Sequence, residues 1–196
     1  MPAGVELVDA ASILPKSMIF NYEGYNTPSA FSNLFRYRML YRNGGYWVDG
    51  DVICLKPFDF LEDYVIAAEL HDGKRMPTSC VLKAPVGSQF MKFCFEQSCQ
   101  KDRAALKWGD LGPKMVAAAV RHHRLQNYVK SHLTFCPLPY QQFRTALFDD
   151  FDCSRSHGVH LWHEMWRRNN LGPNSKFQPN CLYERLREEV ESQVSI

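Results

Sequence analysis

The sequence predicts an α/β fold with a largely parallel sheet flanked by helices. Short strand candidates alternate along the chain with helix candidates, which is the order typical of this class. The 196 residues contain no internal repeat, low-complexity segment or convincing linker. Because this length suits one α/β domain with its own core, we expect a single domain over residues 1–196.

The first elements lead up to a pair of glycines. Residues 5–8 form a short strand candidate, and residues 22–29 read as a loop. Ser29 is placed to cap a helix over residues 30–43. Gly44 and Gly45 end that helix, since glycine readily adopts the backbone conformation of a helix C-cap.

The remaining elements follow at regular intervals. Strands are predicted at residues 64–68, 79–84, 133–140 and 158–162, with a turn at 71–75. Helices are predicted at residues 88–101, from Pro113 onward, and around Leu182, Leu186 and Val190 near the end of the chain.

The segment between the glycine pair and Pro57 holds the main chemical signal. The apolar run Tyr46-Trp47-Val48 is followed by Asp49 and Asp51, with only Gly50 between them. Alternate residues of a strand point to the same side, so the two carboxylates can converge on one cation. Carboxylate oxygens suit Mg²⁺ or Mn²⁺, which commonly bridge protein carboxylates and substrate phosphates. The pattern therefore predicts a metal-assisted site for a phosphate-bearing substrate.

Composition excludes several other classes. The net charge of +2 and the lack of a long basic run argue against nucleic-acid binding. Seven cysteines without a Cys-x-x-Cys pair argue against a disulfide framework or a zinc knuckle and favour reduced thiols in a cytoplasmic protein. The N-terminus lacks the features of a signal peptide, and no apolar stretch approaches the length of a transmembrane segment.

Residues 36–52 read Arg-Tyr-x-x-Leu-Tyr-x-x-Gly-Gly-x-Trp-x-Asp-x-Asp-Val, which resembles the core signature of glycosyltransferase family 32. This family includes transferases of bacterial capsular-polysaccharide synthesis. Weaker similarity continues through residues 109–113 and 158–162. The resemblance implies a GT-A-like, Rossmann-type sheet and a nucleotide-sugar donor, UDP- or GDP-linked. It also implies Mn²⁺ (or Mg²⁺), a glycan or other acceptor, and transfer of a hexose with retention at the anomeric carbon.

The same resemblance implies roles for individual residues. Asn33, Arg36, Trp47 and Asp49 would contact the donor, and Asp51 would bind the metal directly. His160 would complete the metal site, because such transferases often bring a late histidine or acidic side chain back to the cation. A hydrogen-bonded core histidine is the alternative interpretation of His160.

Two departures from the family pattern stand out. Asn33 occupies a position where the family commonly has aspartate, which removes a charge from the expected donor pocket. The usual first strand and helix also do not precede the matched signature, so we expect a form that is short at its N-terminus.

Two alternatives remain open at this stage. Haloacid-dehalogenase-like phosphatases also place Asp-x-Asp after an apolar strand, and there Asp49 would be the nucleophile and Asp51 the general acid. Asp149 and Asp150 would then complete a magnesium site. The other alternative is a shortened glycosyltransferase relative that binds a nucleotide or a partner without catalysis.

Overall fold

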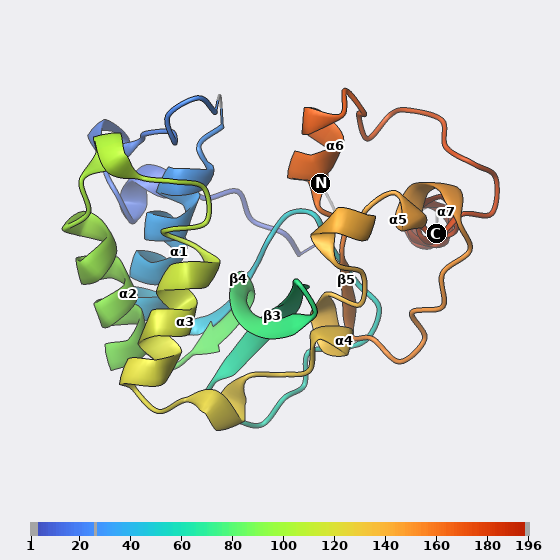
Figure 1. Cartoon of the computed structure of the whole chain (residues 1–196). Helices are drawn as coiled ribbons and strands as arrows, with labels where there is room; N and C mark the ends of the chain where they lie inside the picture. The colour runs from blue at the N-terminus through green and yellow to red at the C-terminus, as the bar shows by residue number, and fades with distance from the viewer. Residues whose placement is uncertain (1–3, 26, 195–196) are drawn as a thin grey trace.

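The computed structural model describes residues 4–25 and 27–194 and has mixed α/β architecture (Figure 1). One sheet has the strand order β1-β4-β3, with β1 at Gly45–Val48, β4 at Lys74–Ala84 and β3 at Val65–His71. A second sheet pairs β2, Val52–Cys54, with β5, Gly158–His160. The prediction of an α/β class is confirmed at this coarse level.

The prediction of a largely parallel sheet is wrong for the described strands. Within each of the two sheets, every strand pair is antiparallel. Strands β3 and β4 form a hairpin around Asp72 and Gly73, which have φ of 49° and 72°. Asp-Gly with two positive φ angles is the preferred two-residue hairpin turn, whereas a parallel pair needs a crossover of a dozen or more residues. The Asp-Gly signal was present in the sequence and outweighs the alternation of strands and helices.

Three helices cover one side of the first sheet, on the left of Figure 1. They are α1 at Ser29–Asn43, α2 at Gln89–Cys99 and α3 at Pro113–His122. Helix α1 contacts α2, α2 contacts α3, and both α1 and α3 contact β4. The core between helices and sheet includes Tyr37, Leu40, Leu82, Phe90 and Val116, all essentially inaccessible to solvent.

The part of the chain that follows α3 lies toward the right of Figure 1. Its helices are α4 at His132–Phe135, α5 at Thr145–Phe148, α6 at His163–Arg168 and α7 at Leu182–Val194. A separate apolar cluster joins Leu147, Val159, Trp166 and Leu182. Short 3-10 helices lie at Ala10–Ser12, Lys16–Met18, Arg103–Ala105, Gln126–Tyr128 and Tyr140–Gln142. The turn between β1 and β2 links the two sheets, and therefore the two clusters.

All four predicted helices are confirmed, while two predicted strands are not. Residues 5–8 have irregular backbone and exposed apolar side chains, because no described strand pairs with them. Residues 133–140 contain the end of α4 and irregular backbone, and Pro137 and Pro139 cannot donate to a strand ladder. Helix α1 begins at Ser29 itself, with Pro28 at the N-cap position, so the predicted cap role of Ser29 is wrong. Among the described residues, no helix combines the length and the apolar character needed to cross a membrane.

Candidate functional site

A cavity with a volume of about 1010 Å³ lies where the two halves of the molecule meet. Its walls come from α1, the β1–β2 turn, the β3–β4 hairpin, the segment before α3, and α6. The volume reaches the upper end of the usual range for small-molecule sites, roughly 300–1,000 Å³. Every site residue predicted from the sequence lines it, namely Asn33, Arg36, Trp47, Asp49, Asp51 and His160.

The Asp49-Gly50-Asp51 segment is the turn that carries the chain from one sheet to the other. The backbone N–H of Asp49 donates to the carbonyl of Cys80 (2.8 Å), so the turn begins while still attached to β4. The N–H of Val52 then donates back to the carbonyl of Asp49 (3.0 Å). The carboxylates of Asp49 and Asp51 and the imidazole of His160 offer ligand atoms that all lie within 4.8 Å of one another. The side chains thus converge through a turn, and not through the strand alternation that we expected.

Asp51 and His160 form a mostly buried acid–base pair. The Nε2 of His160 lies 3.3 Å from Oδ1 of Asp51, and the backbone N–H of His163 donates to Oδ2 (2.9 Å). Burial alone would raise the pKa of Asp51, but the charge of His160, its hydrogen bond and the His163 N–H hold that pKa well below its usual range. Burial likewise disfavours the imidazolium, yet the Asp51 carboxylate raises the pKa of His160 well above its ordinary value. Both shifts favour an imidazolium–carboxylate pair, in which the proton on Nε2 faces Asp51.

Asp49 accepts hydrogen bonds from two side chains, one on α1 and one on β1. Its Oδ1 accepts from Nη1 of Arg36 (2.8 Å) and from the indole N–H of Trp47 (2.6 Å). The guanidinium of Arg36 lies over the Trp47 ring, 4.8 Å from the ring centroid, and also donates to the carbonyls of Ser79 and Ser32. Arg36 is only 5% exposed. Its contacts place it as a support for Asp49, and its contact with a donor stays a prediction.

The face of α1 that carries Arg36 and Asn33 is more buried than its aromatic face. Asn33 and Arg36 are buried beside Tyr37 and Leu40, whereas Phe31, Phe35 and Met39 are only partly buried. The Asn33 amide donates to the Ser29 carbonyl (2.9 Å), and its Oδ1 accepts from the Ser79 hydroxyl (3.3 Å). Asn33 and Arg36 recur at the same helical spacing as the buried Tyr37 and Leu40. This pattern of polar residues on a buried helix face is the feature of the sequence that corresponds to this wall of the cavity.

Glu69 is another carboxylate of the site. It lies at the cavity wall, 4% exposed, near the end of β3. Burial raises its pKa, against the opposing effects of His160 and Thr78. Glu69 directly follows the apolar run Val65-Ile-Ala-Ala68. A continuous apolar run is typical of a strand that is buried on both faces, and this pattern is the feature of the sequence that indicates a buried carboxylate here.

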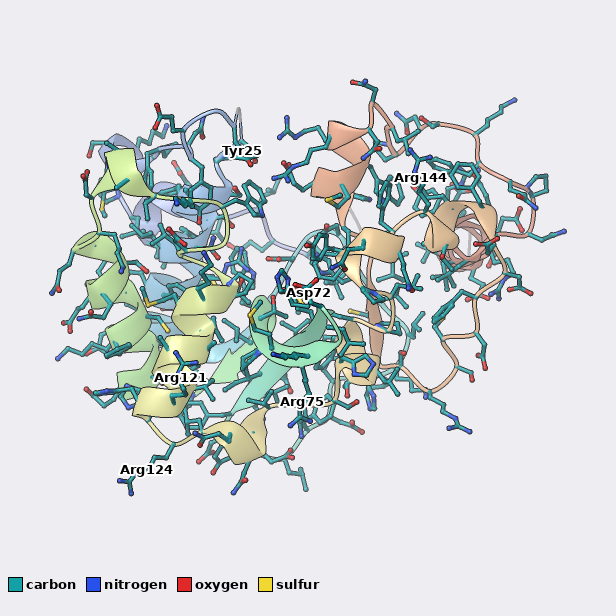
Figure 2. All side chains as sticks on the ribbon, in the orientation of Figure 1. Tyr25, Asp72, Arg75, Arg121, Arg124 and Arg144 are labelled. Atoms are coloured by element: carbon teal, nitrogen blue, oxygen red, sulfur yellow. The ribbon has the colours of Figure 1, made fainter. Side chains whose placement is uncertain are left out.

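A cation–aromatic contact joins the two halves of the molecule near the cavity. Arg168 of α6 lies 4.7 Å from the ring centroid of Tyr25 and 4.5 Å from that of Trp108. Figure 2 labels Tyr25 on the side of the N-terminal segment that faces α6. Trp108, Arg167 and Arg168 line the cavity, and Glu164 pairs with both arginines. No sequence pattern indicates that Trp108 belongs to the site, because its partner Arg168 lies sixty residues further along the chain.

The acidic residues required by the phosphatase alternative lie elsewhere. Neither Asp149 nor Asp150 lines the cavity, and Asp150 pairs with Arg185 of α7 (2.8 Å). Among the described residues, the acidic group around Asp51 is completed by Asp49 and His160 alone.

Comparison with known families agrees with this geometry. Residues 6–70 match the family model described as a glycosyltransferase sugar-binding region containing the DXD motif. The matched region includes α1, β1, the Asp49–Asp51 turn and β2, and ends within β3. No curated protein and no solved structure gave a significant match. The DXD match supports a glycosyltransferase-like family for this protein.

Proposed function

We propose that this protein is a metal-dependent glycosyltransferase that moves a hexose from a UDP- or GDP-sugar to a glycan or other acceptor, with retention at the anomeric carbon. The observation that carries the proposal is the convergence of Asp49, Asp51 and His160 in a large cavity, inside and beside the region that matches the DXD family. Donor, acceptor and stereochemistry follow from the family resemblance of the Arg36–Val52 signature.

The donor set fits Mn²⁺ or Mg²⁺. Two carboxylates and one imidazole provide oxygen and nitrogen ligands, which suit Mn²⁺ well and Mg²⁺ less completely. Asp51 and His160 would hold the cation directly, with Asp49 turned toward the donor. When bound, the metal would neutralise charge on the leaving diphosphate and orient it.

The chain's own residues prepare this site. The His163 N–H and the His160 imidazole fix both oxygens of Asp51, and Arg36 with Trp47 fixes Oδ1 of Asp49. Because His160 shares a proton with Asp51, its Nε2 must lose that proton before it can act as a ligand. Metal binding is therefore expected to release a proton and to weaken as the pH falls.

The test is hydrolysis and transfer from a panel of UDP- and GDP-sugars in the presence of Mn²⁺. Asp51→Asn keeps the size of the side chain and removes its charge, and should lower turnover at least about 100-fold, the loss typical of a missing electrostatic contribution to catalysis. Asp150→Asn removes a carboxylate outside the cavity and is the matched control. Unchanged turnover in Asp51→Asn would contradict the metal assignment.

Calorimetry separates the catalytic proposal from a binding-only protein. A transferase should bind UDP or GDP more tightly with Mn²⁺ than without it and should turn over the corresponding sugar. Binding without any turnover would favour the inactive relative. In that case Asn33→Asp, which restores the residue common in the resembling family, tests whether the missing charge is the cause.

A further inference from the structure

His160 also belongs to a second group of ligating side chains, whose two thiols the proposed transferase does not use. The thiols of Cys80 and Cys136 lie 3.5 Å apart, and one ligand atom from each thiol and from His160 falls within 4.8 Å of the others. Cys80 is 1% exposed, Cys136 is inaccessible, and His160 is 8% exposed. Sequence spacing conceals the group, because no two of its members lie within twenty residues of each other.

Three separate elements place these atoms together. Cys80 belongs to β4, Cys136 follows α4 directly, and His160 ends β5. The neighbouring Phe135 anchors α4 in an apolar cluster with Val65 and Val81, which fixes Cys136 against the sheet. Cys80 also lines the cavity, so the cavity leads to one edge of this group.

The two nitrogens of His160 face different surroundings. Nε2 is 3.3 Å from the Asp51 carboxylate. Nδ1 is fully buried and makes no hydrogen bond of ordinary geometry within the described part of the chain, although the Cys80 thiol interacts with the ring. A buried imidazole nitrogen without a partner is costly, and such groups call for a ligand or another specific explanation.

We propose that Cys80 Sγ, Cys136 Sγ and His160 Nδ1 form a binding site for a thiophilic divalent cation of the zinc class. Two thiolates and one imidazole are soft and borderline ligands that select such metals over Mn²⁺ or Mg²⁺. Binding replaces two S–H bonds by two metal–sulfur bonds and the Nδ1–H bond of the His160 imidazolium by a metal–nitrogen bond, and it releases three protons to solvent with no change in oxidation state. A fourth position is supplied by water from the cavity.

A cation bound at this thiol site prevents His160 from acting as a ligand in the carboxylate site. A neutral imidazole has a lone pair on only one of its two nitrogens. A cation on Nδ1 therefore leaves the proton on Nε2, where it is donated to Asp51, and removes His160 from the Mn²⁺ ligands. This part of the inference rests on the proposed function, whereas the thiol site itself does not.

Cobalt is the probe for the thiol site. Co²⁺ titrated into the reduced full-length protein should produce one equivalent of thiolate-to-cobalt charge-transfer absorption in the near ultraviolet, which Zn²⁺ abolishes. Cys80→Ala and Cys136→Ala should each weaken Co²⁺ binding at least about tenfold, and the double variant should lose the band. Cys94→Ala removes an equally buried thiol from the helix-side core and should leave the band unchanged. Absence of the band in the unmodified protein, or its persistence in the folded double variant, would overturn the thiol site.

Mn²⁺ binding, followed by electron paramagnetic resonance, tests the opposition between the two sites. One equivalent of Zn²⁺ should weaken Mn²⁺ binding at least about tenfold in the unmodified protein and clearly less in the Cys80→Ala/Cys136→Ala variant, where Zn²⁺ can only compete for the carboxylate site itself. Equal Mn²⁺ affinity with and without Zn²⁺ would refute the coupling through His160. A cobalt–thiolate band without any nucleotide-sugar turnover would count against the transferase alone.

Discussion

Replacing Arg36 with methionine should destabilise the protein strongly, because it leaves the Asp49 carboxylate without its cation. Arg36 is 5% exposed, pairs with Asp49 at 2.8 Å, and donates to the Ser79 carbonyl at 2.6 Å. Methionine retains much of the side-chain volume, so the change mainly removes charge and hydrogen bonds.

The structure sets the expected magnitude. Removing one partner of a buried ion pair costs about 3–5 kcal/mol. The Asp49 side chain is 21% exposed, which lets solvent stabilise part of the uncompensated charge, so we expect a loss of about 3 kcal/mol in the free energy of unfolding. For a chain of this length, that loss corresponds to a fall in Tm of roughly 6–12 °C.

Urea and thermal unfolding of Arg36→Met, Asp49→Asn and the double variant form the assay. The double variant should be more stable than the sum of the single losses predicts, by about 2 kcal/mol, because the two residues act on each other. Arg38→Met, on the same helix and in contact with the rings of Tyr41 and Phe95, is the control and should lose less than about 1 kcal/mol. A coupling below about 0.5 kcal/mol would refute the assignment of Arg36 as the support of Asp49.

Two further predictions concern the Asp51–His160 pair and the glycine that follows α1. Asp51→Asn should lower the free energy of unfolding most at pH values between 3.8 and 6.5, the ordinary pKa values of Asp51 and His160. The lowered pKa of Asp51 means that its contribution fades as the pH falls below 3.8, and the raised pKa of His160 means that its contribution fades as the pH rises above 6.5. Urea unfolding from about pH 3 to about pH 10 measures this profile, and a difference that does not vary with pH would contradict it. Gly44→Ala should cost about 3 kcal/mol, because φ is +65° and the added Cβ would lie 2.8 Å from the Val86 backbone nitrogen. Gly45→Ala, with positive φ but open space, should cost only about 1 kcal/mol in the same thermal unfolding assay, and equal losses would exclude the steric contact as the cause.

Local signals in the sequence were reliable where neighbours along the chain decide the structure. The helix that ends at Gly44 was predicted to within one residue, because a glycine C-cap and a helical apolar pattern are both local. The Asp72-Gly73 dipeptide is an equally local signal, which favours an antiparallel hairpin. The alternation of strands and helices favours a parallel sheet instead, and here the local signal is the correct one. Residues 133–140 were predicted as a strand from composition, although their prolines cannot complete a ladder.

The sequence by itself predicted the Asp49-Gly50-Asp51 motif and, through its family resemblance, that Asn33, Arg36, Trp47 and His160 belong to the same site, and all of these residues line the cavity. It did so because the residues of this motif are contiguous and their chemistry is specific. Only the tertiary structure decided that Glu69 faces the cavity and that Arg36 is tied to Asp49. It alone brought the thiols of Cys80 and Cys136 and a ring nitrogen of His160 within 4.8 Å of one another. These contacts join residues far apart along the chain, and they depend on how two sheets and their helices pack, which local sequence patterns do not encode.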